Sequence, residues 1–198
     1  LKGSPALRRR FLNVELSQIS QSYLYYLVTY NRTVAQRNTL LKQQRVDPGL
    51  LAIYDEQLAA AGAQLVVRRA RAVAELDQLA GRYHSLLSEG RERLHLEYQS
   101  QGLPAGADPE LEAVAGRLHA LLEHRRQDEL RRQITLVGPH RDDVAFWIND
   151  RNAHLYASQG QQRTAVLALK LAELDYMNGQ IGEYPILMLE DVASELDP

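Results

Sequence analysis

The sequence predicts an α/β protein with a helical arm, on three observations. Apolar residues recur every seven positions through two long stretches between Leu12 and Leu86. Short apolar runs bounded by turn residues follow, and a polar loop at 156–164 leads into another apolar-periodic stretch. Spacing by seven is typical of long packed helices and short runs are typical of strands, so a helical lobe is expected beside a smaller α/β part.

Composition narrows the class of protein. The 198 residues are 45% hydrophobic and 24% charged, which is ordinary for a soluble globular chain. The formal net charge of −2 argues against coating nucleic acid by bulk charge, so any DNA binding must come from local clusters. The absence of cysteine excludes disulfides, thiol catalysis and thiolate metal sites. No apolar run approaches the roughly 20 residues of a membrane span, and the start at Leu1 suggests a piece of a longer protein.

The first arm helix is expected from Leu12 to near Arg45. Residues 1–11 before it are expected to be an irregular basic segment, because a glycine and a proline precede three arginines. The helix carries its buried stripe in two rows, which are Leu12, Ile19, Tyr26, Thr33 and Leu40, and Leu16, Tyr23 and Tyr30.

A second arm helix is expected from Pro48 to about Gly90. Asp47 would cap it, with Pro48 in the first helical position. The short link predicts an antiparallel two-helix hairpin, and about 1.5 Å per residue gives it a reach on the order of 45–55 Å. The apolar row of this helix is Leu51, Leu58, Leu65, Ala72, Leu79 and Leu86.

The rest of the chain is expected to alternate short strands with helices. A third helix should run from Leu111 to about Arg132, after an exposed loop at 101–108. Strands are predicted at 94–98, 134–137 and 185–189, and a hairpin of 144–148 and 153–155 around 149–152.

The polar loop at 156–164 has the composition of an anion site. Ser158 offers a hydroxyl, Gly160 lets the backbone approach a ligand, and Gln161 follows at the start of a helix, whose dipole favours anions. The alternative is that Ser158 is only an N-cap in a turn.

Two adjacent acids, Glu190 and Asp191, end the apolar run 185–189. An open α/β sheet places its ligand site at the carboxyl end of such a strand. The alternative is a pair of solvated acids that close the strand.

These stretches together resemble the signature loop, the Walker B strand and the D-loop of ABC-type ATPases. The finer resemblance is to the RecF family of bacterial DNA-repair proteins, which is related to the SMC proteins. The residues that carry it are spread over the whole chain and are Gly3-Ser4-Pro5, Leu7 to Leu12, Gln36-Arg37-Asn38, Gly138 to Asp143, Ser158 to Arg163 and Glu190 to Asp197.

The resemblance implies roles for individual residues. Ser158, Gly160 and Gln161 would close over the γ-phosphate of ATP held by a second subunit. Glu190 would hold Mg²⁺ through water, and Asp191 would be the catalytic acid that orients the attacking water. Glu190 departs from the aspartate of the family, and one extra methylene moves the carboxylate by about 1.5 Å. Asp197 would be the D-loop residue that crosses the dimer interface.

The same resemblance divides the chain into a basic segment leading out of the ATPase lobe (1–11), a mainly helical arm lobe (12–133) and a C-proximal, partial ATPase domain (134–198). A Walker A loop, Gly-x-x-x-x-Gly-Lys-Ser/Thr, is missing from the sequence. This fragment alone is therefore expected neither to hydrolyse ATP nor to bind it tightly. The intact dimeric protein is expected to be a slow ATPase.

The implied biology is bacterial and cytoplasmic, with no membrane. An ATP-dependent homodimer would clamp duplex, gapped or junction DNA and act with RecO and RecR. Arg8, Arg9 and Arg10 are candidate DNA contacts. The alternative, which the pattern favours for any single cluster, is a solvated helix face with intrachain pairs to Glu and Asp.

Two other functions remain open on the sequence. The ATPase subunit of a membrane transporter shares the loop and strand motifs, but a coiled arm of this length argues against it. A helical protein-interaction module without a nucleotide role would explain the heptads alone.

Overall fold

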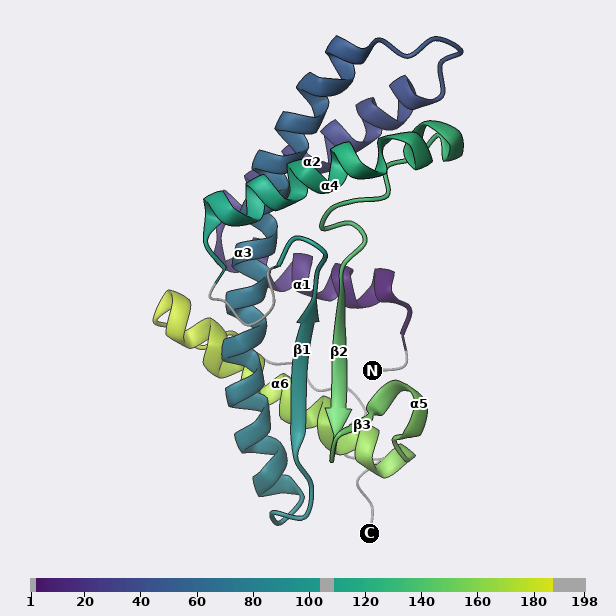
Figure 1. The fold of residues 1–198 in the computed structure, drawn as a ribbon. Helices are drawn as coiled ribbons and strands as arrows, with labels where there is room; N and C mark the ends of the chain where they lie inside the picture. The colour runs from purple at the N-terminus through teal and green to yellow at the C-terminus, as the bar shows by residue number, and fades with distance from the viewer. Residues whose placement is uncertain (1–2, 104–108, 187–198) are drawn as a thin grey trace.

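One long helix, α3 (Pro48–Leu87), organises the molecule. The computed structural model describes residues 3–103 and 109–186. Helices α2 (Gln21–Leu41) and α4 (Leu111–Arg132) pack on the N-terminal half of α3, while strand β1 (Leu94–Gln99) and helix α6 (Gln159–Ile181) lie along its C-terminal half (Figure 1). The mainly helical fold with a small sheet agrees with the predicted class.

The N-terminal part is more helical than predicted. Helix α1 (Pro5–Ile19) includes the three arginines, so the irregular segment expected at 1–11 is wrong. Ser4 is in the N-cap position and Pro5 begins the helix, where its missing N–H costs nothing. The single helix expected from Leu12 to Arg45 is also wrong, because Ser20 is extended (φ −143°, ψ 106°) and its Oγ accepts the N–H of Tyr23 to cap α2.

The predicted hairpin exists but is shorter than expected. Asp47 caps α3 by accepting the N–H groups of Gly49 and Leu50, and Pro48 is the first helical residue, as predicted. The 21 residues of α2 correspond to about 30 Å of helix, less than the predicted reach. The difference arises because the second half of α3 contacts β1 and α6 rather than α2 (Figure 1).

A three-stranded antiparallel sheet lies beside α3. β1 pairs with β2 (Asp143–Ile148) from Leu94 opposite Ile148 to Gln99 opposite Asp143. These strands come from either side of the boundary predicted at residue 133. β2 turns into β3 (Arg151–Asn152) through two residues with positive φ, as a tight right-twisted hairpin requires. The second strand expected at 153–155 is wrong, since Asn152 caps the short helix α5 (Ala153–Tyr156).

The strand expected at 134–137 is also absent from the described structure, and side chains take the place of a strand partner. The Thr135 N–H donates to Asn38 Oδ1 (2.7 Å), and the Thr135 carbonyl accepts from Arg141 Nη2 (2.8 Å). The Leu136 N–H donates to Glu129 Oε1 (2.6 Å). Because these backbone N–H and C=O groups already have hydrogen-bond partners, this segment does not need to pair with a neighbouring strand.

A buried ionic cluster joins helices α2, α3 and α4. The Arg37 guanidinium, which has no exposed surface, donates to Asp55 (2.7 Å), Glu129 (2.6 Å) and Thr135 Oγ1 (3.0 Å). Arg126 reaches the other oxygen of Asp55 (2.9 Å). Arg37 and Asn38, two residues of one family-like motif, therefore hold α2, α3, α4 and the 135 segment together.

Candidate nucleotide-facing helix and basic pocket

The loop singled out in the sequence forms the start of α6. Ser158 Oγ accepts the N–H of Gln161 (3.2 Å), and Gln161 Oε1 accepts the N–H of Ser158 (2.9 Å), which is a reciprocal capping box. Ser158 is therefore an N-cap, and its role toward ATP stays a prediction. Ser158 and Gly160 remain exposed while Gln161 is half-buried, so the first turn, with its helix-terminal N–H groups, is open to an anion.

Gly160 is not required by the fold. A Cβ added there would meet nothing closer than Ser158 Oγ at 4.0 Å, and the backbone is not in the left-handed region. Glycine destabilises a helix relative to alanine. The described structure thus gives no reason for glycine at this position, whereas close approach of an anion to the backbone is a reason.

Contacts between side chains link the first turn of α6 to the start of β1 and to α3. Gln161 Nε2 donates to Glu92 Oε1 (2.8 Å), just before β1. Glu92 Oε2 lies 3.7 Å from Nε2 of His84, which is fully buried on α3. The Gln161–Glu92 hydrogen bond therefore ties the first turn of α6 to the segment just before β1.

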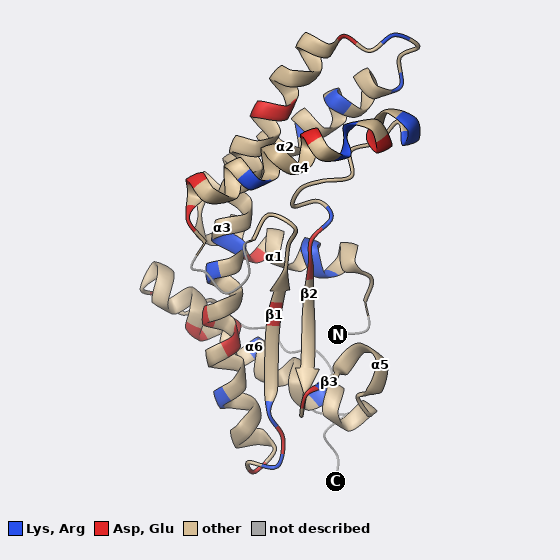
Figure 2. Ribbon diagram, in the orientation of Figure 1, with Lys and Arg blue, Asp and Glu red and all other residues tan. Residues whose placement is uncertain are grey.

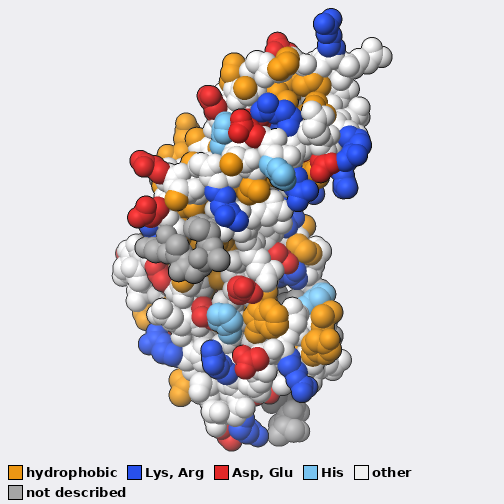
Figure 3. Space-filling model, viewed as in Figure 1, with side chains coloured by type: hydrophobic (Ala, Val, Ile, Leu, Met, Phe, Trp, Pro, Cys, Tyr) orange, Lys and Arg blue, Asp and Glu red, His pale blue; other side chains and the backbone are white. Residues whose placement is uncertain are grey.

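Two large apolar side chains lie exposed immediately before this turn. Leu155 is 67% and Tyr156 69% exposed, both on α5. Figure 3 shows hydrophobic side chains gathered over α5 on this face. Exposed apolar side chains that gather in this way are typical of a surface that meets another protein.

The predicted acids lie outside the described residues. This applies to Glu190, Asp191 and Asp197, and to the strand interior beyond Ile186, so the Mg²⁺ site and the catalytic role stay predictions. Pro185 and Ile186, which are described, are not in a strand, and Ile186 is 95% exposed. Within 3–103 and 109–186 there is no group of three His, Asp or Glu residues placed to hold a metal.

The three predicted DNA-contacting arginines differ in their environments. Arg8 is committed to a two-point ion pair with Asp143 (2.7 and 2.6 Å). Arg9 donates to the backbone carbonyl of Asp142 (2.7 Å), and Arg10 is exposed. Figure 2 shows basic positions mixed with acidic ones along the ribbon rather than on one face, so a local pocket matters more than bulk charge.

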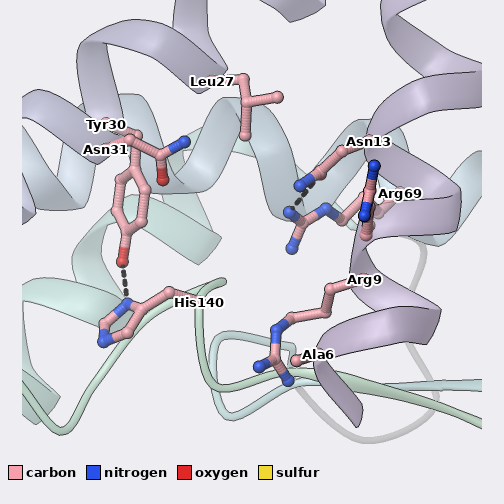
Figure 4. A pocket seen from close by; sticks show the side chains of 9 residues that line it. Ala6, Arg9, Asn13, Leu27, Tyr30, Asn31, Arg69 and His140 are labelled. Atoms are coloured by element: carbon pink, nitrogen blue, oxygen red, sulfur yellow. Dashed lines mark hydrogen bonds between the residues drawn. The ribbon is translucent and has the colours of Figure 1, made fainter. Parts of the chain in front are cut away.

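Arg9 and Arg10 line a pocket of about 270 Å³ between α1, α2 and α3, which we call the α1–α3 pocket. Figure 4 shows Arg9, Asn13 and Arg69 from one side and Tyr30, Asn31 and His140 from the other. Its lining residues are Ala6, Arg9, Arg10, Asn13, Leu27, Tyr30, Asn31, Arg69 and His140.

One wall of this pocket is built by the family-like motif at 138–143. Gly138 has φ +121°, and a Cβ there would lie 2.2 Å from the Tyr30 hydroxyl, so only glycine fits. Tyr30 Oη is 2.7 Å from His140 Nδ1, and His140 Nε2 is 3.2 Å from the Thr135 carbonyl. The carbonyl can only accept, so Nε2 carries the hydrogen and Nδ1 accepts from Tyr30. Burial lowers the pKa of His140 to about 4, which keeps the ring neutral.

A buried arginine forms the floor of the pocket. Arg69, 2% exposed, donates to Tyr23 Oη (2.9 Å), Asn13 Oδ1 (2.8 Å) and the Pro139 carbonyl (2.7 Å). The nearby Asp142 carboxylate is bound instead by the Tyr98 hydroxyl. Burial raises the pKa of Asp142 to about 6, although that hydrogen bond and the charge of Arg69 act in the opposite direction.

Sequence reasoning missed Arg69 and Glu92 as site residues. Arg69 lies four residues after Leu65 and three before Ala72, on the buried stripe of α3. Spacing could therefore have identified it. No local pattern marks Glu92, whose importance depends on the packing of α6 against the start of β1.

Comparison with known proteins gives full-length matches to this chain. It is 65% identical over 198 residues to the "DNA replication and repair protein RecF" of Symbiobacterium thermophilum, and 43% identical over 201 residues to that of Bacillus velezensis. These alignments cover 100% of this chain and 53% and 54% of the relatives. No family model matches.

Solved structures agree. A structure of "the recombination mediator protein RecF-ATPrS in RecFOR pathway" superimposes with a TM-score of 0.93 at 35% identity, covering 99% of this chain and 53% of that one. A RecF-ATP structure gives the same TM-score over 100% of this chain. The chain thus spans about half the length of the relatives it matches. None of the helices described here has the length and apolarity needed to cross a membrane.

Proposed function

Because this chain belongs to the RecF family, we propose that it forms part of an ATP-dependent DNA replication and repair factor. Its contribution is the surface that closes over ATP bound to a second copy of the protein. The observation that carries this proposal is the exposed first turn of α6, with a glycine that its own fold does not require.

The residues of this turn have the chemistry for that role. The Ser158 hydroxyl and the N–H groups around Gly160 are donors at a helix N-terminus, where an anionic γ-phosphate is favoured. Gln161 holds the turn in place through Glu92. Exposed Leu155 and Tyr156 supply apolar area for the subunit contact.

The remaining assignments follow from the family and are part of the proposal. Glu190 would hold Mg²⁺, Asp191 would orient the attacking water and Asp197 would cross the interface. Bound Mg²⁺ neutralises charge on the phosphates. Residues 134–198 form the ATPase portion, 12–133 the arm lobe and 1–11 the connecting segment.

The whole protein is proposed to be a slow, dimeric ATPase of the bacterial cytoplasm that clamps duplex, gapped or junction DNA. RecO and RecR are its proposed partners, since a matching structure is described within the RecFOR pathway. The 198-residue segment alone is proposed to be inactive, because it contains no Walker A sequence.

The test is a Ser158→Arg substitution in the full-length protein. A long cation in the first turn blocks the approach of a second subunit, so ATP-dependent dimerisation should be lost in size-exclusion chromatography with light scattering. Gly179→Arg is the matched control, because it places the same charge on α6 at a position where a Cβ meets nothing within 4 Å. A Ser158→Arg protein that still dimerises with ATP would exclude the proposed role of this turn.

A further inference from the structure

The α1–α3 pocket has an unbalanced charge. Among the residues that the structure describes, its walls carry three arginines, Arg9, Arg10 and Arg69, and no carboxylate. His140, the other basic side chain, stays neutral at pH 7 because burial lowers its pKa to about 4. The pocket is therefore cationic although the whole chain carries a net charge of −2.

The buried Arg69 is central to this imbalance. Each of its three hydrogen bonds ends on a neutral oxygen, from a tyrosine, an asparagine and a backbone carbonyl. Asp142, the nearby acid, accepts a hydrogen bond from the Tyr98 hydroxyl rather than from Arg69. A buried cation without a directly bonded carboxylate is costly unless an anion approaches it.

Arg9 and Arg10 extend the positive charge toward solvent. Burial and, after it, the neighbouring charge of Arg69 lower the pKa of Arg9, while the carboxylates of Asp143 and Asp142 act in the opposite direction. Arg10 is exposed and has no ion pair with any residue in the described ranges. An anion placed between these guanidinium groups would relieve the repulsion.

We propose that the α1–α3 pocket binds a phosphate group. Guanidinium forks match the tetrahedral oxygens of phosphate. Arg9 uses Nη1 on the Asp142 carbonyl, and its other N–H groups and those of Arg10 are the donors for such a ligand. The side-chain amides of Asn13 and Asn31 add polar contacts at the rim, and a volume of about 270 Å³ leaves room for a sugar attached to the phosphate.

The phosphate has two possible sources, a nucleic acid backbone and a free nucleotide or inorganic phosphate. If the source is DNA, the pocket would be one of the DNA contacts of the proposed function, and this inference then rests on that function. The pocket is separate from the α6 turn, because none of its lining residues belongs to α5 or α6.

The key variant is Arg10→Ala in the full-length protein, since Arg10 is exposed and its loss should not unfold the chain. The matched control is Arg32→Ala, which removes one exposed arginine from the neighbouring α2 without touching the pocket. Arg9→Ala provides a second pocket variant.

The first arm measures the thermal midpoint with inorganic phosphate or AMP against chloride and acetate at matched ionic strength. Phosphate or AMP should raise the midpoint of the wild type and of Arg32→Ala, with the rise reduced in both pocket variants. An equal rise in acetate, or an equal response of Arg10→Ala and Arg32→Ala, would overturn the phosphate assignment.

The second arm measures duplex DNA affinity with ATP across a salt series. Loss of one phosphate contact lowers the slope of log Kobs against log salt concentration by about 1. A drop of that size in Arg10→Ala but not in Arg32→Ala identifies the DNA backbone as the ligand, while an unchanged slope with a phosphate response in the first arm identifies a free phosphate compound.

The two proposals fail separately. If Arg9→Ala and Arg10→Ala behave like Arg32→Ala in both arms, the pocket proposal is overturned, while normal DNA binding leaves the proposed function intact. Absence of ATP-dependent DNA binding in the wild type refutes the DNA-clamping function, and the first arm still decides whether the pocket takes phosphate.

Discussion

Removal of the Arg37 guanidinium is the most direct test of the packing of the arm lobe. Arg37→Met keeps much of the side-chain volume but removes the cation that bonds Asp55 (2.7 Å) and Glu129 (2.6 Å). All three side chains have no exposed surface, so no water replaces the lost bonds. Breaking a buried ion pair on one side costs about 3–5 kcal/mol, because a charge is left uncompensated.

The size of the loss in the free energy of unfolding depends on the contacts that Asp55 and Glu129 keep. Asp55 keeps its bond to Arg126 (2.9 Å), and Glu129 keeps the N–H of Leu136 (2.6 Å). We therefore expect a loss of about 3 kcal/mol in the free energy of unfolding, at the lower end of the range. A second change, Glu129→Gln, removes one stranded charge and should restore part of that loss.

Urea denaturation followed by circular dichroism measures the effect. Arg32→Met, an exposed arginine on the same helix, should change the free energy of unfolding by no more than about 0.5 kcal/mol. A loss below about 1 kcal/mol would refute this account of the cluster.

Three further predictions concern single residues. Burial lowers the pKa of His140 to about 4, below the 6.5 of a free histidine, so its neutral form stabilises the fold and this contribution is lost as the pH falls from about 6.5 towards 4. Denaturation between pH 7 and 5 should therefore show the wild type losing more free energy of unfolding than His140→Gln. Equal dependence of the two free energies on pH would contradict the assignment. Burial raises the pKa of Glu173 to about 7, so the free energy of unfolding falls as the pH rises from about 4.5 to 7. Since one pKa unit corresponds to about 1.4 kcal/mol, Glu173→Gln should be more stable than the wild type at pH 8 by roughly 1 kcal/mol or more. A variant less stable than the wild type at pH 8 would show that the Lys170 contact dominates. Gly160→Ala should leave thermal stability equal or slightly higher while it weakens ATP-dependent dimerisation of the full-length protein, and an unchanged dimer would mean that glycine serves no ligand there.

Local chemistry explains what the sequence predicted well. The cap of α3 at Asp47 and the start of α6 at Ser158 depend on residues within four positions, so a short window contains the whole cause. The break at Ser20 was missed because a serine within a regular apolar pattern looks compatible with a continuous helix. The strand expected at 134–137 was wrong because distant side chains satisfy its backbone.

The buried arginines show a different limit. Arg37 continues the row of Leu16, Tyr23 and Tyr30 at a spacing of seven, so periodicity alone places it inside the lobe. An arginine, however, is expected to be exposed to solvent, because burial of a charge is favourable only beside its partners. Those partners lie 18 and 92 residues away in sequence, and no local pattern reveals them.

The two candidate sites share one structural element. Arg69 in the α1–α3 pocket and His84 beneath the start of α6 both lie on α3, 15 positions apart, which corresponds to about 22 Å along a helix. The hydrogen bonds of α3 are continuous across this interval, since Pro48–Leu87 is a single α-helix. One continuous helix therefore contributes to the α1–α3 pocket and also passes beneath the turn proposed to face the nucleotide. A mutation that bends α3 between Arg69 and His84 should change their relative position without touching either site.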